Sequence, residues 1–523
     1  MTTVTYRMSE DVQERASFAA RDVPTYGAVV DPTADDLVPL LEDMDPKGGV
    51  STQILMAQED QLPKAAKLPQ YVAAVSVTLG GFALGNVLSW TSPTQGVLED
   101  KLGTNSWAWV GALMALGAAV AVLPVGYLID KIGRKYTMLG LVLPFTAGWA
   151  LIAWADDSAA MYMVGRFITG MMGGAFSLTA PAYTSEISEK EIRGRLGSYF
   201  QLMLTIGILF VYGLGSVLTV FELSVVCGVV PLVFGVVFLF MPETPLYYLQ
   251  QGQKDRAEAS LKWFRGRNYA VESELQEIQT SVDEVAAQKL SITEAFRTTE
   301  AKRGLMIAFG LMIFQQLSGV NAVIFYATDI FKSAGSTLEP STATIIVGVI
   351  QAVATFISTL VVDLLGRRKL LLLSDFVMAI CTLLLGIYFY LRNETDFDDS
   401  NLGWLPLTSV CLFIVVFSLG YGPIPWMMVG ELFAPQIKGF ASSFSCVLNW
   451  ILAFVVTRFY SDLALSFGTH TTFWIFAVIS AIGTAFVFFF VPETKSKTLD
   501  QIQKELGGSA PAPSVATADI PKC

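Results

Sequence analysis

Stretches of the chain that are otherwise almost wholly apolar contain amide side chains, and six of these amides are candidates for binding a ligand. They occupy four such stretches and are Gln201, Gln315, Gln316, Asn321, Gln351 and Asn449. An amide buried in hydrocarbon is costly unless it finds a hydrogen-bond partner. Because an amide both donates and accepts hydrogen bonds, the set suits a ligand made of hydroxyl groups, which also do both. The alternative is that these amides only bridge neighbouring helices.

Two tryptophans could complete such a binding site. Trp426 lies between Pro423 and Pro425 and offers an apolar ring face to the C–H face of a ligand, and Trp450 can do the same. The alternative for both rings is ordinary packing. The two prolines indicate a hinge at which their helix bends.

The amides can converge only if one helix is interrupted. Gln316 and Asn321 are five residues apart, which places them on different sides of a continuous helix. We therefore predict a break at Ser318-Gly319, between them.

The elements that carry these residues are membrane-spanning helices. The 523 residues are 53% hydrophobic and 15% charged, with a mean hydropathy of +0.53, whereas soluble domains are about 25% charged. About 20 apolar residues cross about 30 Å of hydrocarbon. Twelve apolar runs have this character, near 71–92, 107–129, 137–155, 159–182, 197–220, 224–241, 304–327, 342–364, 370–391, 405–430, 441–460 and 471–491. We predict an all-α integral membrane protein with twelve transmembrane helices, which excludes soluble enzymes and outer-membrane barrels.

Charged motifs recur in the same order in the two halves of the chain. Each motif of the first half is matched about 240 residues later in the second, as 363 − 130 = 233, 431 − 186 = 245 and 493 − 243 = 250 show. The residues are Asp130, Arg134, Glu186, Arg193 and Glu243 in the first half, and Asp363, Arg367, Arg368, Glu431, Lys438 and Glu493 in the second. Two six-helix halves related in parallel are typical of a rocking transporter with its site between the halves.

This repeat predicts five segments. Residues 69–241 and 304–491 are the six-helix halves, and 242–303 are a cytoplasmic loop with helical patches at 255–264 and 272–288. Residues 1–68 are predicted to be a disordered cytoplasmic tail, and 492–523 a second cytoplasmic tail.

The charges indicate orientation and a mechanical role. Lys and Arg gather in the short loops beside the motifs, so that side should be cytoplasmic. The sequon at Asn393 then falls outside, as a glycosylation candidate. Ion pairs among the motif residues could latch the cytoplasmic ends of the helices together, or could only anchor helix ends.

Several classes of function lack the residues that they need. The chain has one histidine, His470, which leaves no material for a metal cluster or a deep catalytic triad. It has no phosphate-binding G-x-x-x-x-G-K-[ST] loop for ATP, and its net charge of −11 gives no basic surface for nucleic acid. We expect no enzyme, no cofactor and no metal, with membrane lipid and a small molecule as the partners.

The motifs of this chain resemble those of a known family. QQLSGVNAVIFYA at 315–327, GPIPWMMVGELF at 422–433, GRR at 366–368 and the two PET motifs resemble the sugar porter family of the major facilitator superfamily. Within it, 91–93 and 417–426 look most like insect facilitated trehalose transporters. The resemblance implies alternating access, a substrate such as trehalose or a hexose like glucose, and substrate contact by the amides and tryptophans above. It also implies a monomer in the plasma membrane. The orientation that the charges predict places both termini in the cytoplasm.

The absence of one acid favours passive transport. Proton-coupled relatives carry an aspartate in the first helix near the arginine that corresponds to Arg166, but no acid precedes Glu99 in that helix here. We therefore predict a uniporter in which Arg166 pairs with carbonyls or polar side chains. The alternatives are a proton-coupled symporter and a sugar sensor that does not transport.

Three further residues bear on the mechanism. Asp375 is predicted to be an interfacial acid near the cytoplasmic end, paired with the basic cluster 366–369; the alternative is a proton site. Ser418 and Leu246 stand where the family often has an acid and an arginine, so the gate near the tenth helix could differ.

Overall fold

Twenty helices and no strands make up the part of the chain that the structure, a computed structural model, describes. That part is residues 65–189, 191–287, 297–333, 339–395, 402–433, 435–495, 497 and 499–507. All of them belong to one compact unit, 65–523. The predicted tail 1–68 lies outside the described residues except for its last four, and so does the end of the chain from 508.

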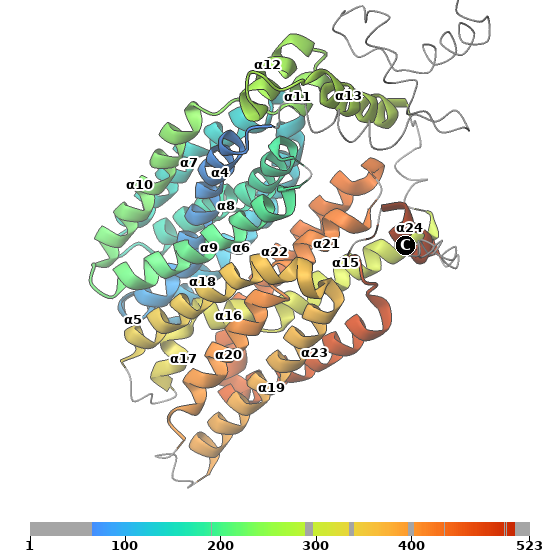
Figure 1. Ribbon diagram of the computed structural model, residues 1–523. Coiled ribbons are helices and arrows are strands. Elements are labelled where there is room, and N and C mark those ends of the chain that lie inside the picture. Colours follow the sequence, from blue (N-terminus) through green and yellow to red (C-terminus); the bar gives the residue numbers. More distant parts are fainter. Residues whose placement is uncertain are drawn as a thin grey trace, which may run out of the picture. The chain divides into compact units, whose positions relative to one another are not determined.

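The N-terminal half contains seven helices (Figure 1). They are α4 (Leu68–Ser89), α5 (Thr91–Leu102), α6 (Thr104–Ile132), α7 (Arg134–Ala153), α8 (Ala159–Ile187), α9 (Arg193–Gly215) and α10 (Val220–Leu239). Helix α8 packs against α6, α7 and α4, and α10 packs against α7 and α4.

The C-terminal half repeats this arrangement with more interruptions. It contains α15 (Thr299–Leu317), α16 (Val320–Phe325), α17 (Ala327–Ser333), α18 (Pro340–Leu365), α19 (Arg367–Glu394), α20 (Leu405–Leu419), α21 (Ile424–Leu432), α22 (Pro435–Phe467) and α23 (Thr469–Phe490). The halves meet where α6 packs on α22 and where α9 packs on α18. The two contacts correspond to each other, because α18 is the counterpart of α6 in the repeat and α22 is the counterpart of α9.

Eleven segments of the described chain are long and apolar enough to cross a membrane. Helix α8 is the twelfth that the sequence predicts, and its 29 residues are also long enough. It carries Arg166 and Glu186, which lower its mean hydropathy. Helices α6, α7 and α4 surround it, so these polar groups face protein.

Four short helices lie at one end of the bundle, where the repeated motifs also lie. They are α11 (Pro245–Gln250), α12 (Lys254–Arg265), α13 (Glu272–Ala287) and α24 (Leu499–Gly507) (Figure 1). The two helical patches predicted between the halves are confirmed as α12 and α13. We call this end the motif end, and the opposite end, with α5 and α17, the far end.

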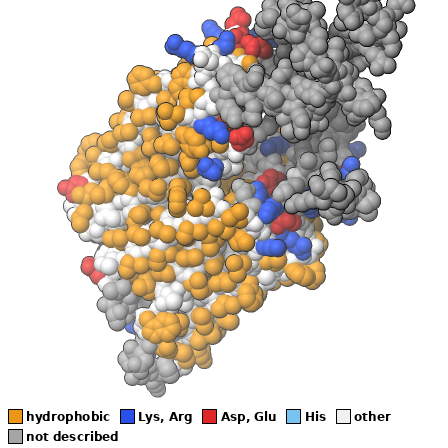
Figure 2. Space-filling model, in the orientation of Figure 1, with side chains coloured by type: hydrophobic (Ala, Val, Ile, Leu, Met, Phe, Trp, Pro, Cys, Tyr) orange, Lys and Arg blue, Asp and Glu red, His pale blue; other side chains and the backbone are white. Residues whose placement is uncertain are grey.

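The outside of the helix bundle is apolar. Figure 2 shows a broad hydrophobic surface over the helices, with charged side chains gathered beside the motif end. Leu143, Phe240 and Phe489 are each about three-quarters exposed. A soluble protein rarely exposes so large an apolar surface, whereas lipid covers it at no cost.

Candidate functional site

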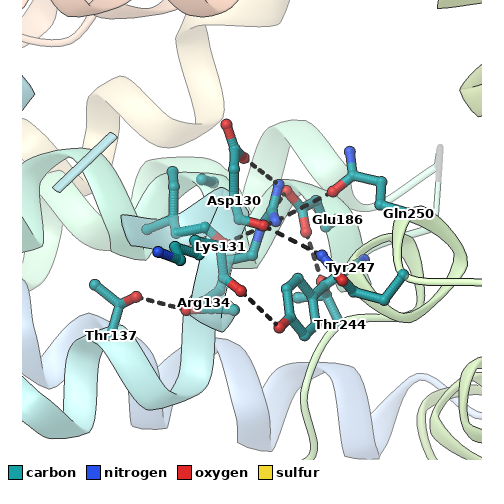
Figure 3. A network of polar contacts seen from close by, with 12 residues as sticks. Asp130, Lys131, Arg134, Thr137, Glu186, Thr244, Tyr247 and Gln250 are labelled. Carbon is teal, nitrogen blue, oxygen red and sulfur yellow. Dashed lines mark hydrogen bonds and ion pairs between the residues drawn. The ribbon is translucent and has the colours of Figure 1, made fainter. Parts of the chain in front are cut away.

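Arg134 is the centre of a polar network at the motif end of the N-terminal half (Figure 3). Its Nε donates to Glu186 Oε1 at 2.9 Å and its Nη1 donates to the Ile129 carbonyl at 3.1 Å. The second oxygen of Glu186 accepts from Thr244 Oγ1 at 2.6 Å. Asp130 approaches Arg134 at 3.5 Å. The network joins α6, α7, α8 and the start of α11.

Glu243 forms a second part of the same corner. Its carboxylate accepts from the backbone N–H groups of Lys135 and Thr244, both at 2.8 Å. It is 2% exposed, and burial raises its pKa, although the two backbone donors act in the opposite direction. Gly133, at φ 95°, leaves room for this carboxylate; a Cβ there would collide with Glu243 Oε2.

The C-terminal half builds the same corner from its own copies of the motifs. Arg367 Nη2 donates to Glu431 Oε1 at 3.2 Å, and Thr494 Oγ1 donates to the other oxygen at 2.5 Å. Glu493 accepts from the backbone N–H of Arg367 at 2.9 Å and of Arg368 at 3.1 Å. Gly366, at φ 90°, repeats Gly133. The predicted repeat is therefore a repeat of three-dimensional structure.

The ion pairs Arg134–Glu186 and Arg367–Glu431 each lie within one half. In this conformation they tie neighbouring helices of a half together. The remaining predicted residues lie outside these two ion pairs. Arg193 donates to the Ser188 carbonyl at 3.2 Å, and Lys438 is exposed at the start of α22. The side chain of Asp363 is not among those that the structure describes.

Four of the six predicted amides form one buried cluster in the C-terminal half. Gln316 Nε2 donates to Asn449 Oδ1 at 2.9 Å, and Asn449 Nδ2 donates to Gln315 Oε1 at 2.6 Å. Asn321 donates to Gln316 Oε1. Each of the four is less than a tenth exposed. The hydrogen bonds satisfy the amides and hold them in one place, between α15, α16 and α22.

The predicted helix break brings these amides together. Helix α15 ends at Leu317 and α16 begins at Val320, with Gly319 at φ 88° between them. A Cβ at Gly319 would lie 2.5 Å from the Phe476 ring, so glycine is required by both space and conformation. The prediction of an interruption at Ser318-Gly319 is confirmed.

A second break lies directly beside the cluster. Gln315 Nε2 donates to the backbone carbonyls of Tyr421 at 2.6 Å and Gly422 at 3.1 Å. These carbonyls belong to the residues 420–423 between α20 and α21, where the prolines predicted a bend. We call 420–423 the hinge. One amide of the cluster thus holds the hinge directly.

The other predicted residues surround this region. Gln201 on α9 and Pro423 line a pocket between the two halves, together with Ser198, Thr355, Ser358, Thr359, Val362 and Met427. Gln351 on α18 is buried, Trp426 on α21 is half-buried, and Trp450 on α22 is 6% exposed.

Arg166 pairs with carbonyls, as predicted. It is fully buried on α8, where Nη1 donates to the Val87 carbonyl at 2.6 Å and Nε donates to the Val110 carbonyl at 3.2 Å. Its guanidinium also lies over the Trp90 ring at 5.5 Å. These contacts join α8 to α4 and α6.

The preferred prediction for Asp375 is wrong. The residue is not interfacial: it is 0% exposed. The arginines of the basic cluster point elsewhere, since Arg367 contacts Glu431 and Arg368 Nη2 donates to the Phe488 carbonyl. Helix packing around α19 covers Asp375, a feature that counting residues from Lys369 could not reveal.

Polar contacts join the two halves near the far end. Ser92 and Thr328 share a hydrogen bond between their hydroxyls at 2.9 Å, and Tyr212 OH donates to the Ile324 carbonyl at 2.8 Å. Arg458 Nη2 donates to Asn105 Oδ1 at 3.2 Å. The halves are therefore in contact at the end opposite the motifs.

Comparison with known proteins agrees with this geometry. The family model for sugar (and other) transporters matches residues 70–506. The chain belongs to this family. A facilitated trehalose transporter, Tret1, of Culex quinquefasciatus is 41% identical over 84% of this chain and 86% of its own length. Tret1 of Polypedilum vanderplanki is 40% identical over 84% and 88%.

Solved structures show the same fold for this member of the sugar transporter family. The proton:xylose symporter XylE bound to 6-bromo-6-deoxy-D-glucose has a TM-score of 0.71 at 24% identity, covering 84% of this chain and 99% of that one. A partially occluded inward-open XylE from E. coli has a TM-score of 0.70, covering 82% and 99%. The all-α fold of two six-helix halves is thus confirmed as the major facilitator fold.

Sequence reasoning missed three contributors to these sites. Thr244 and Thr494 complete the two corners by donating to glutamates, and the hinge carbonyl of Tyr421 binds Gln315. The sequence contains a pattern that could have predicted the two threonines, because both follow the glutamate in the repeated Pro-Glu-Thr. The carbonyl had none, because every residue carries one.

Proposed function

We propose that this chain is a facilitative sugar carrier that works by alternating access, with trehalose as the substrate and glucose-like hexoses next in order. The observation that carries the proposal is the amide cluster of Gln315, Gln316, Asn321 and Asn449. It concentrates donors and acceptors for hydroxyl groups inside the bundle. The names of the Tret1 relatives support trehalose and facilitated transport.

The site residues have distinct roles in this proposal. The cluster binds sugar hydroxyls, Gln201 and Gln351 contribute from α9 and α18, and Trp426 and Trp450 cover the apolar face of the ring. Because Gln315 holds the hinge through two carbonyls, a sugar that competes for this amide would loosen the hinge. That supports a coupling of binding to movement.

The corners at the motif end act as rigid anchors in the conformation described, and as latches between the halves when that end closes. The far-end contacts Ser92–Thr328 and Tyr212–Ile324 would break when the far end opens. Alternating access requires these two sets of contacts to exchange.

The cellular setting is also proposed. We place the chain in the plasma membrane as a monomer, with both termini cytoplasmic and Asn393 outside, where it carries a glycan. Asn393 is exposed in the last turn of α19, which supports its access to modification.

Uptake of labelled trehalose into proteoliposomes, with and without an inward proton gradient, tests the function. We expect uptake that equilibrates without accumulating, and that Gln316→Ala abolishes. Gln279→Ala is a matched control, because it removes an amide on α13, away from the cluster, that donates to Asp283. Accumulation driven by the gradient would show a symporter, and transport of glucose alone would change the substrate.

A further inference from the structure

Asp375 carries a buried carboxyl group that takes no part in the proposed sugar site. It lies eight residues into α19, about 12 Å along the helix from its start. It is 0% exposed, and neither carboxyl oxygen has a hydrogen-bond partner among the described residues. Among the described residues, Arg166 in the other half is also a fully buried charged residue, but two carbonyls accept hydrogen bonds from its Nε and Nη1.

The groups that face this carboxyl are neutral. The hydroxyls of Tyr421 from the hinge and Ser480 from α23 lie beside it, without hydrogen-bonding geometry. Gly483 on α23 leaves room for Oδ2, since a Cβ there would collide with it, and the Phe314 ring of α15 lies next to the same position.

Two titratable groups on the surrounding helices contact residues other than Asp375. Glu431 on α21 contacts Arg367 and Thr494, and His470 on α23 packs against Tyr390 and Trp474. Helix α20 has no charged residue. Helix α18 has one, Asp363, two residues before its end at Leu365, and Glu339 precedes its other end. An unpaired carboxylate out of water costs several kcal/mol, so this geometry favours the neutral acid with its proton on Oδ1 or Oδ2.

The carboxyl is connected to the sugar site through the hinge. Its neighbour Ser374 accepts a hydrogen bond from the Tyr421 backbone N–H at 3.2 Å, and the Tyr421 carbonyl accepts from Gln315 at 2.6 Å. Gly420 packs directly on α19, because a Cβ there would lie 2.6 Å from the Leu370 carbonyl. A charge on Asp375 would therefore attract water and hydroxyl donors to the place where the hinge must keep its shape.

We propose that Asp375 is a proton-binding site of the C-terminal half, and that the carrier moves sugar only while this proton is bound. The inference rests on the proposed sugar transport and adds a control by pH. The ligand is a single proton, held behind the hinge and exchanged with water when the hinge rearranges. Loss of the proton uncouples Gln315 from a well-ordered hinge and slows transport.

Exchange of labelled trehalose between the two sides of proteoliposomes, at equal pH inside and outside, tests the proposal without any gradient. We expect the wild-type rate to fall about tenfold per pH unit once the proton is lost. Asp375→Asn, which keeps the shape of the neutral acid, should exchange sugar at a rate independent of pH. Glu258→Gln, which changes a half-exposed carboxylate on α12, should keep the wild-type profile. The same pH dependence in Asp375→Asn and the wild type would overturn the proposal.

A second measurement needs neither transport nor a variant. An apolar carbodiimide, which reacts with protonated carboxylic acids in apolar surroundings, should label Asp375 of the full-length wild-type chain. Mass spectrometry should find the adduct at neutral pH and less of it at alkaline pH. An unlabelled Asp375 at every pH would refute the proton site. If the chain exchanges no sugar at all, the proposed function fails, while the labelling still decides the proton site.

Discussion

Gly133 and Gly366 offer a test of how the two corners are built. Each occupies the turn before a motif arginine, with φ of 95° and 90° and ψ of 165° and 160°. This backbone region is essentially restricted to glycine. Each glycine also leaves space for a buried glutamate, so that alanine would displace Glu243 in one half and Glu493 in the other.

The cost of each alanine has two parts. Placing a side chain in this backbone region costs about 1–3 kcal/mol. Moving the glutamate weakens its two hydrogen bonds from backbone N–H groups, at about 1 kcal/mol each. We therefore expect Gly133→Ala and Gly366→Ala each to destabilise the protein by about 3–5 kcal/mol, which is more than a hundredfold in the folding equilibrium.

Matched controls lie on neighbouring helices. Gly140 on α7 and Gly439 on α22 are exposed, and a Cβ at either position meets no atom within 4 Å. Alanine at these positions should be neutral, or stabilising by up to about 1 kcal/mol. The difference is measured by thermal melting of the four purified variants in detergent. The readout is the fraction that stays monodisperse in size-exclusion chromatography.

The two corners have the same glycine conformation and the same buried glutamate, so the two alanine variants should lose similar stability. If Gly133→Ala melted together with Gly140→Ala, the corner would not need its glycine and the argument would be refuted. A large loss for one half only would show that the repeated corners differ in strength.

Three further predictions address pH, the far end and modification. Burial raises the pKa of Glu243 above its usual 4.5. The contribution of Glu243 to stability is therefore full in acid and is lost as the pH rises through the raised pKa. The melting temperature of the wild type relative to Glu243→Gln should fall as the pH rises through that pKa, and a constant difference would contradict this. Ser92→Cys combined with Thr328→Cys should form a disulfide on oxidation that stops sugar uptake until a reductant is added, whereas full uptake after complete cross-linking would show that the far end need not open. In insect cells, Asn393→Gln should remove a glycosidase-sensitive mass shift that the wild type shows, and a wild type without that shift would contradict an outer, glycosylated loop.

The sequence by itself determined the membrane-spanning helices, the repeat of two halves and the break at Gly319. These features are local or periodic. Hydropathy over about 20 residues decides a span, and a glycine between two amide-bearing turns permits an interruption. The carbonyl partners of Arg166 followed as well, since a buried cation without an acid nearby must find other acceptors.

Only the tertiary structure decided which groups meet. The ion pairs of Arg134 and Arg367 lie within their own halves, because α8 and α21 bring Glu186 and Glu431 to them. Asp375 is buried although it lies only six residues after Lys369, because the hinge and Gly483 close over it. Such contacts join residues more than 40 positions apart, and the sequence has no local signal for the packing that creates them.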